Sequence, residues 1–398
     1  MTRGSTSRRR TIWLALSALV ATAAIGIPIA SSAGAPTNPY TQTNLISDIP
    51  GVARITDPNL VNPWGQATIG GSPLWVANNG SDTSTLYTGG VNGTIPAPAP
   101  PPPAGPLVVN IDGGAPTGTV GNTTGSTTDF LVHTAMGTAP ANFIFASENG
   151  DITAWSRTVS GTEASIVGSG AARAVYKGLA LATVGRSNFL YATDFRHARI
   201  DVFDGDFNRI RFPSGPFARM AFVDPNIPDG FAPFGIQLIN NELYVSYAKQ
   251  DRHRHDDVAG PGNGFVDVFS TSGVMQSRLI SGGDLNSPWG LVLAPSNFGG
   301  FSGALLVGNF GDGTIHAYDP NNGTEAGALT NTDGNTIAIN GLWGLRFGNG
   351  TFGATNALVF TAGIGDEGHG LLGEITPPTC RRTGSPVAVM QSASAIAR

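Results

Sequence analysis

The sequence predicts an all-β fold, a six-bladed β-propeller, and the first observation behind this prediction is a repeat of about 55 residues. Each repeat opens with a short phrase that contains a glycine, and Trp or Phe precedes that glycine in four copies. The second observation is that short apolar runs separated by turn residues follow each phrase, which is typical of propeller blades. The phrase glycines are Gly65, Gly178, Gly235, Gly290 and Gly344, so the steps are 113, 57, 55 and 54 residues, and the first step spans two repeats.

The repeat that begins at Gly290 shows the strand pattern most clearly. Its apolar runs are short, and turn dipeptides such as Asp312-Gly313 separate them. After residue 35 no segment has the periodicity of an amphipathic helix. The strands of this repeat are expected at 290–293, 304–309 and 314–319, with a less regular one within 329–339.

The N-terminal strand is expected to complete the last blade and close the ring. The last repeat, 344–375, is one strand short, whereas residues 44–48 resemble the expected outer strand at 278–282. Both of these segments lead into a Pro-Trp-Gly phrase. Closure in this way would remove a free sheet edge, so we expect the propeller to extend over residues 40–376.

The composition and the N-terminus predict an exported protein. Only 12% of the residues are charged, and the chain has 55 glycines. Residues 1–35 are expected to be a signal peptide, with three arginines at 8–10 and an apolar segment at 12–30. A membrane anchor is the alternative, but Gly26 and Pro28 interrupt the apolar segment. We therefore expect a secreted or periplasmic protein with no membrane span after cleavage, and the arginines also fit the twin-arginine export route.

The charge balance argues against nucleic acid as a partner. Removing the four arginines of the expected signal peptide from the 22 Lys and Arg leaves 18 against 27 Asp and Glu, a net charge of −9. The single cysteine, Cys380, lies in a tail at 377–398 that we expect to be disordered, so no intrachain disulfide can form. We expect a monomer with no organic cofactor.

Five phrases stand out, at residues 62–65, 145–148, 191–195, 255–264 and 307–313. They resemble a family of exported bacterial β-propeller proteins, some members of which carry a PEP-CTERM sorting tail. The resemblance covers about residues 40–375, and it implies a fold and an export route but no activity. The blade openings more distantly resemble those of NHL-repeat and gluconolactonase-type propellers.

Four residues with side-chain oxygens, each at the end of the second strand of a different blade, are candidate metal ligands. These ends are expected on one face around the central channel, and a ring of such oxygens suits calcium or another divalent cation. The resemblance to gluconolactonase-type propellers implies a divalent metal in the channel. The structural alternative is that each side chain bonds the backbone of the adjacent turns. The four residues are Asn78, Glu148, Asp194 and Asn309.

The loop at 249–263 is a candidate source of catalytic groups. His255 with Asp256 and Asp257 could form an acid–base pair or bind a transition metal, although a solvated charged loop is the alternative. His369 lies in the matching loop of the last repeat and could face them across the channel. The candidate catalytic residues are His255, Asp257 and His369.

Four large aromatic residues at the blade openings are candidate ligand-binding residues. Such rings could stack on sugars or other flat ligands at the rim of the channel, or they could pack between blades. These residues are Trp64, Phe234, Trp289 and Trp343.

Together these features favour a secreted propeller that binds a divalent cation and a small-molecule, glycan or polymer ligand. A metal-assisted hydrolase or lyase of lactones or polysaccharides is the alternative, and a protein-interaction scaffold is a third hypothesis. The sequence contains no Gly-x-Ser-x-Gly elbow, P-loop or His-Glu-x-x-His motif. The sequence therefore leaves open whether the protein is an enzyme.

Overall fold

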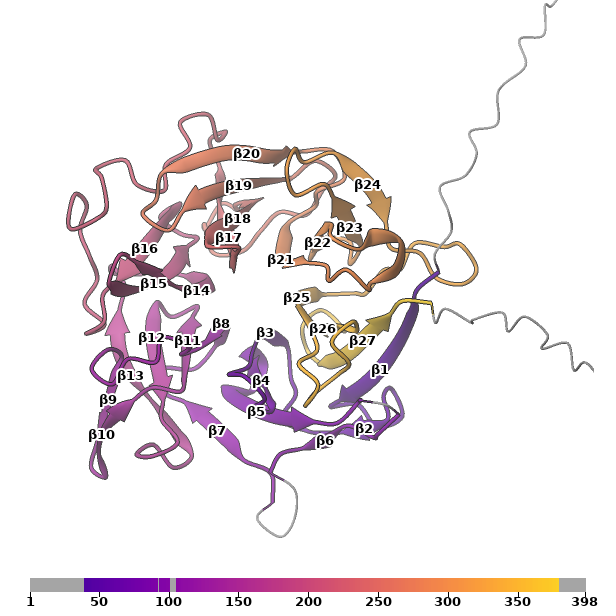
Figure 1. Cartoon of the computed structure of the whole chain (residues 1–398), viewed down its shortest axis with the longest axis horizontal. Helices are drawn as coiled ribbons and strands as arrows, with labels where there is room; N and C mark the ends of the chain where they lie inside the picture. Colours follow the sequence, from indigo (N-terminus) through magenta and orange to yellow (C-terminus); the bar gives the residue numbers. More distant parts are fainter. Residues whose placement is uncertain (1–38, 92, 101–104, 379–398) are drawn as a thin grey trace, which may run out of the picture. The chain divides into compact units, whose positions relative to one another are not determined.

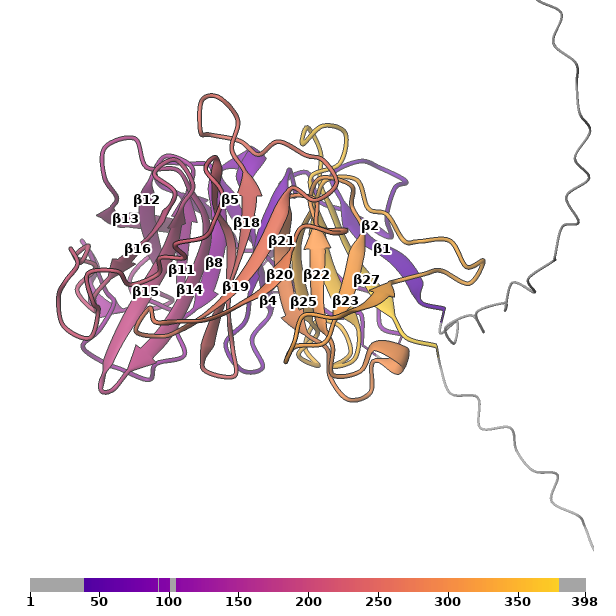
Figure 2. The same cartoon turned by 90° about the horizontal axis from the view of Figure 1, so that it is seen from above.

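The protein has an all-β, propeller-like fold. The computed structural model describes residues 39–91, 93–100 and 105–378, and these residues form β-sheets that stand in sequence order around a central axis (Figure 1). Loops extend from both faces of this ring (Figure 2). Within the described ranges there are two short 3-10 helices and no α-helix, and no helix there is long and apolar enough to cross a bilayer. The expected signal peptide, and the expected tail from residue 379 onward, lie outside the described residues.

Three of the sheets have the form of single blades, with antiparallel strands that follow one another in sequence. The first contains β14 (Tyr176–Val184), β15 (Ser187–Asp194) and β16 (Arg199–Phe203). The second contains β17 (Phe231–Ile239), β18 (Glu242–Lys249), β19 (Gly264–Ser270) and β20 (Met275–Ser281). The third contains β21 (Pro288–Leu293), β22 (Leu305–Asn309), β23 (Ile315–Tyr318) and β24 (Glu325–Ala328), with the 3-10 helix η2 (Gly299–Phe301) between its first two strands.

A fourth sheet joins the two ends of the described chain. Strand β1 pairs antiparallel with β27, with Thr41 opposite Thr376, so the outer position is filled by the N-terminal strand. The segment 44–48, which the sequence predicts to be a strand, overlaps β1. The strands of this sheet are β25 (Leu342–Phe347), β26 (Leu358–Ala362), β27 (Leu371–Thr376), β1 (Thr41–Ser47) and β2 (Ile55–Thr56).

The remaining sheet has nine strands, and its two halves meet where β7 and β13 pair in parallel. One half contains β3 (Pro63–Ala67), β4 (Leu74–Asn78), β5 (Thr83–Thr88), β6 (Ala97–Pro98) and β7 (Val108–Ile111), with the 3-10 helix η1 (Asn79–Ser81). The other half contains β8 (Pro116–Gly121), β11 (Phe143–Ser147), β12 (Asp151–Trp155) and β13 (Glu163–Ser169). A separate hairpin consists of β9 (Leu131–Thr134) and β10 (Gly137–Pro140).

The repeated glycines lie where neighbouring inner strands approach each other most closely. A Cβ atom on Gly235 would lie 2.1 Å from the Trp289 carbonyl oxygen, and one on Gly290 would lie 2.6 Å from the carbonyl oxygen of Trp343. A side chain cannot fit at these positions, so the repeat in the sequence records backbone packing around the axis. Gly118 on β8 is the copy that was not predicted, because its phrase at 116–119 contains no aromatic residue, whereas the phrase of Gly178 contains Tyr176.

Candidate functional site

A buried lysine lies at the centre of the candidate site. Lys177 precedes the repeat glycine Gly178 on β14, a position that Trp or Phe holds in four other repeats. Its side chain is only 2% exposed, and its Nζ lies 2.5 Å from Glu148 Oε1 and 3.3 Å from Asp256 Oδ1. Lys177 is not among the residues predicted from the sequence, although a lysine at an otherwise aromatic repeat position is the signal that could have identified it.

Aromatic side chains form the floor beneath Lys177. The Trp64 and Trp343 rings stack with centroids 3.4 Å apart, and Trp289 meets both of them edge-on. The Lys177 ammonium lies 5.2 Å from the Trp64 ring centroid, within the range of a cation–π interaction. With Phe234, these are the four predicted ligand-binding residues, and all four are buried in one cluster. Their burial is what the packing alternative predicts.

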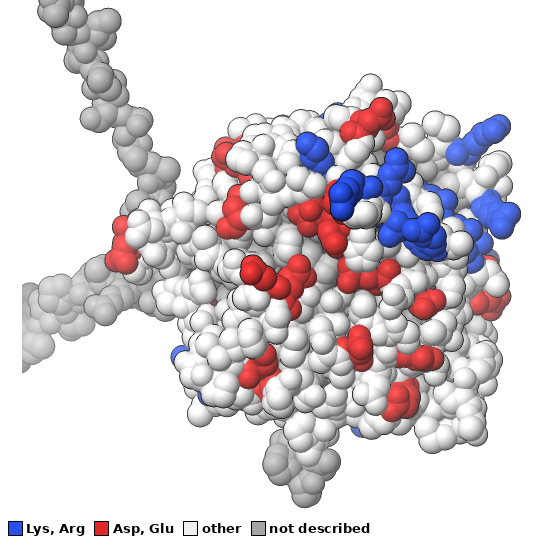
Figure 3. Space-filling view, turned by 180° about the vertical axis from the view of Figure 1, so that it is seen from behind, with Lys and Arg blue, Asp and Glu red and all other residues white. Residues whose placement is uncertain are grey.

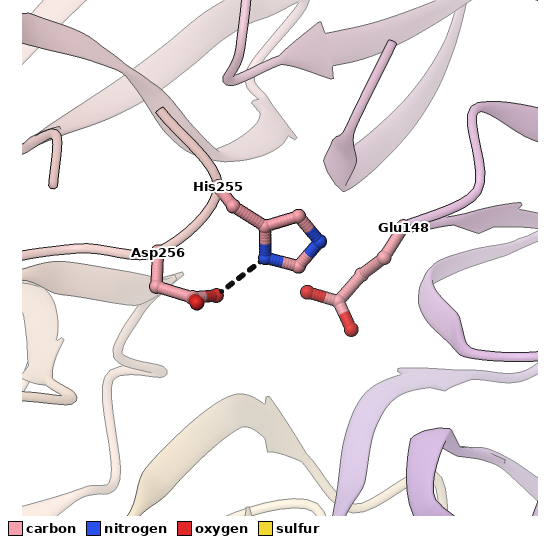
Figure 4. Close-up of side chains that lie close together, drawn as sticks. All are labelled: Glu148, His255 and Asp256. Atoms are coloured by element: carbon pink, nitrogen blue, oxygen red, sulfur yellow. Dashed lines mark hydrogen bonds and ion pairs between the residues drawn. The ribbon is translucent and has the colours of Figure 1, made fainter. Parts of the chain in front are cut away.

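Three potential metal ligands from two loops converge beside Lys177. Glu148 follows β11, whereas His255 and Asp256 lie in the loop between β18 and β19. One ligand atom from each of them lies within 4.8 Å of the others (Figure 4). His255 Nδ1 is hydrogen-bonded to Asp256 Oδ1 at 2.8 Å, and Asn79 Nδ2 donates to Glu148 Oε2 at 2.9 Å. We call Glu148, Lys177, His255 and Asp256 the channel cluster.

Lys177 remains a cation in this environment. Burial by itself would lower the pKa of Lys177, but the negative charges of Glu148 and Asp256 raise it above its ordinary value. In turn, burial would raise the pKa of Asp256, but Lys177 and His255 hold it below its usual range. Lys177 is therefore a fixed positive charge and is not available as a neutral amine.

Two further carboxyl groups near the channel cluster have raised pKa values, in contrast to Asp256. Burial raises the pKa of Glu367, and the charges of Glu148 and Asp256 raise it further, although Glu367 accepts a 2.8 Å hydrogen bond from Asn62. Burial also raises the pKa of Asp257. Lys177 thus contacts two carboxylates, and these two further carboxyl groups feel its charge and the charge of Asp256; an additional cation would relieve the repulsion among these carboxylates.

The three predicted metal ligands other than Glu148 form hydrogen bonds or ion pairs with neighbouring residues of the fold. Asn78 Nδ2 donates to the hydroxyl groups of Thr83 and Thr85 on the next strand. Asp194 pairs with His197 Nδ1 at 2.6 Å and accepts bonds from two backbone amides. Asn309 likewise bonds backbone atoms of the segment before β21. These contacts are of the kind that the structural alternative predicts.

The predicted catalytic residues lie in two different places. His255 belongs to the channel cluster, and its bonded partner is Asp256, which the sequence had offered together with Asp257; only Asp257 was named among the candidate catalytic residues. His369 is half-exposed, and its Nδ1 pairs with Asp48 Oδ2 at 2.7 Å, beyond the end of β1. Since that partner comes from the opposite end of the chain, sequence spacing could not have indicated it.

Comparison with known proteins assigns the chain to a family. No family model matches the chain. The chain is 34% identical over 340 residues to the uncharacterized protein R648 of Acanthamoeba polyphaga mimivirus, covering 83% of this chain and 78% of R648. It is 32% identical over 342 residues to the uncharacterized protein L690 of the same virus, covering 83% of this chain and 84% of L690. The chain belongs to the same family as these proteins, and its resemblance to exported bacterial proteins stays a prediction.

Solved structures with a similar fold include the GH93 alpha-L-arabinofuranosidase of Fusarium graminearum in complex with arabinobiose. The TM-score is 0.48 at 11% sequence identity, and the match covers 85% of this chain and 98% of that chain.

Proposed function

We propose that the channel cluster binds a divalent cation and presents it to a small-molecule or glycan ligand. The observation that carries this proposal is the convergence of Glu148, His255 and Asp256, with ligand atoms within 4.8 Å of one another. Two carboxylates and an imidazole suit zinc or manganese better than calcium, which prefers oxygen ligands alone. The excess of carboxyl groups around Lys177 supports the same proposal.

The Lys177 ammonium would compete with that cation for the carboxylates of Glu148 and Asp256. It contacts carboxylate oxygens of both Glu148 and Asp256, so it supplies positive charge where a metal ion would bind. A metal ion would have to share these carboxylates with Lys177 or displace its ammonium group. We therefore expect metal affinity to be moderate, and to increase when Lys177 is replaced by an uncharged residue.

Thermal melting with and without added metal tests the proposal. After treatment with chelator, zinc or manganese should raise the melting temperature of the protein in a concentration-dependent manner, because a ligand that binds only the native state stabilises it. Glu148→Gln should abolish this rise. Glu163→Gln, at an exposed position of β13, is the matched control and should retain it. An equal metal-induced rise in melting temperature in Glu148→Gln and in the wild type would contradict the proposed site.

A metal-assisted hydrolase or lyase is the second candidate, and the separation of carboxyl pKa values near the channel cluster favours it. The pKa of Asp256 is lowered, which favours an ionised carboxylate, and the pKa of Glu367 is raised, which favours a carboxyl group that can donate a proton. A pair of carboxyl groups with pKa values shifted in opposite directions is typical of acid–base active sites. In hydrolysis of a lactone, His255 would accept the proton of the attacking water, and Glu367 would protonate the leaving oxygen. Glu148 and Asp256 would hold the metal ion.

A panel of lactones and polysaccharides tests this second candidate. If the protein turns over one of them, Glu367→Gln should lower kcat by about 100-fold or more, because an amide cannot donate a carboxyl proton. Glu242→Gln, on β18, should leave kcat unchanged. Equal activity of Glu367→Gln and the wild type would rule out Glu367 as the acid.

We also infer that the propeller has six blades. The inner strands β3, β8, β14, β17, β21 and β25 contact one another in turn, and β25 contacts β3 again. Each of them carries a repeat glycine, including Gly118 on β8. The nine-stranded sheet then consists of two blades joined at β7 and β13. A variant truncated before Ile49 lacks β1, and we expect it to melt about 10 °C lower because the edge of β27 is exposed.

We further propose that the protein is exported after removal of residues 1–35. The arginines at 8–10 and the apolar segment at 12–30 support this proposal. Expression of the full chain in a bacterium, followed by N-terminal sequencing of the protein from the periplasm and medium, should give a mature start close to Pro36. Retention of the entire protein in the cytoplasm, with Met1 intact, would contradict it.

A further inference from the structure

A pocket lined by arginines lies beside the blade formed by β14–β16. Its volume is about 880 Å³, and it extends from β16 to the start of β17. Four of its arginines come from β16 and the connection that directly follows it, and the fifth comes from the loop after β18. They are Arg199, Arg209, Arg211, Arg219 and Arg254.

The pocket arises because this blade has three strands, whereas the next blade has four. The connection 204–230 crosses the outer side of β16 and pairs with it only through an isolated bridge between Phe203 and Arg209. Phe212 and Phe222 of this connection form an apolar wall of the pocket together with Phe231. The pocket is the space left between β16, this connection and the start of β17.

The charge of the pocket is opposite in sign to that of the whole chain. Five arginines and three aspartates, namely Asp201, Asp224 and Asp229, line it, a net charge of +2, whereas the chain has a net charge of −5. Lys and Arg side chains gather in one region of the molecular surface, near β16 and the segment that follows it (Figure 3).

Some of these charges are already paired within the protein. Asp201 is bound by Arg199 and Arg209, and Asp224 is bound by Arg278. The other three arginines of the pocket form no ion pair with any residue in the described part of the chain. These three guanidinium groups, of Arg211, Arg219 and Arg254, are therefore available to an external anion.

We propose that this pocket binds a carboxylate-bearing sugar, a short oligomer of uronic acid units. Guanidinium groups bind carboxylates through two parallel hydrogen bonds, and three such groups can engage carboxylates on successive sugar units. The apolar wall offers Phe212 and Phe231 to the flat faces of the sugar rings. The volume falls within the range of about 300–1,000 Å³ that is usual for small-ligand sites. This site is separate from the channel cluster and does not depend on a metal ion.

Calorimetric titration with trigalacturonic acid tests the proposal, with neutral maltotriose as the control ligand. We expect trigalacturonic acid to bind and maltotriose not to bind, and we expect the affinity to fall as salt is added. The double variant Arg219→Gln/Arg254→Gln should bind trigalacturonic acid at least about tenfold more weakly. Arg186→Gln, in the exposed turn between β14 and β15, is the matched control and should bind as the wild type does.

The melting temperature of each variant separates a loss of binding from a loss of folding. An unchanged melting temperature, and an unchanged metal-induced rise, would show that Arg219→Gln/Arg254→Gln is folded and that the channel cluster is intact. Absence of binding at millimolar trigalacturonic acid, or equal binding by the double variant, would overturn the proposal. Tighter binding of inorganic phosphate than of trigalacturonic acid would also overturn the assignment to carboxylate sugars.

Discussion

The channel cluster and the arginine pocket are neighbours with opposite charge patterns. Around the channel one lysine is surrounded by carboxyl groups, whereas in the pocket most charged groups are arginines. The loop between β18 and β19 contributes to both, because Arg254 lines the pocket while the adjacent His255 belongs to the channel cluster. The local sign of charge, and not the net charge of the chain, therefore determines which ligand each site can attract.

The two sites also differ in burial. Lys177 is enclosed by its carboxylate partners and by aromatic rings, so its charge is part of the folded core. The pocket arginines with no internal ion pair lie on the surface. Changes at the channel should therefore reduce stability, whereas changes at the exposed arginines of the pocket should affect mainly the affinity for a ligand.

The aromatic floor of the channel gives the largest expected effect. Trp343→Ala removes a buried ring that contacts Trp64 and Trp289, and it should lower the free energy of unfolding by about 3–5 kcal/mol. Phe212→Ala removes a half-buried ring of the pocket, and it should lower the free energy of unfolding by less than Trp343→Ala does. Chemical denaturation of both variants measures the difference, and equal losses would contradict the contrast between the two sites.

Replacement of the buried lysine should have the next largest effect. Lys177→Met leaves Glu148, which is 16% exposed, without its cation, and should lower the free energy of unfolding by about 3 kcal/mol. The double variant Lys177→Met/Glu148→Gln should recover part of this loss, because no unpaired charge remains. Exposed Lys249→Met is the control. A Lys177→Met variant as stable as the wild type would show that the ion pair is not part of the core.

A buried aspartate beside the pocket should make stability depend on pH. Burial raises the pKa of Asp267, on β19, to about 7. Between pH 4 and pH 7 the folded state then holds a proton that the unfolded state releases, so the contribution of this group is full at low pH and is lost as pH rises through 7.

The isosteric variant Asp267→Asn measures this dependence. At pH 8 it should be more stable than the wild type by about 2 kcal/mol. This is less than the raised pKa of Asp267 alone implies, because the Arg278 guanidinium lies 3.5 Å from the Asp267 carboxylate and stabilises its ionised form. The difference should approach zero near pH 4. A difference that did not change between pH 4 and pH 8 would show that Asp267 is ionised throughout.

The smallest effect on stability is expected at the pocket surface. Arg211→Gln should change the free energy of unfolding by no more than about 0.5 kcal/mol, because no ion pair to Arg211 forms in the described ranges. The same variant should bind trigalacturonic acid more weakly than the wild type. A large loss of stability would mean that the arginine is structural.

The repeat made the propeller-like fold predictable from the sequence, because close packing at the axis requires glycine in every inner strand. Gly118 was not assigned, since its phrase at 116–119 contains no aromatic residue. The lysine before the glycine of the next repeat was also overlooked. The glycine, and not the ring before it, is thus the constant part of the pattern.

The candidate site was predictable only in part. His255 and Glu148 were both singled out from the sequence, but their convergence depends on how two loops of different blades meet. The pairing of His255 with Asp256, and that of His369 with Asp48, depend on side-chain direction and on contacts between distant segments. The arginine pocket was not predicted, because four of its arginines lie close together at 199–219 but Arg254 and the apolar wall join them only in the fold.

A crystal structure with bound manganese would test the central claim most directly, by the anomalous signal of the metal. The account predicts a peak about 2.0–2.4 Å from carboxylate oxygens of Glu148 and Asp256 and from a ring nitrogen of His255, with the Lys177 ammonium moved away. A crystal at saturating manganese with no peak there, and with Lys177 still between Glu148 and Asp256, would contradict it.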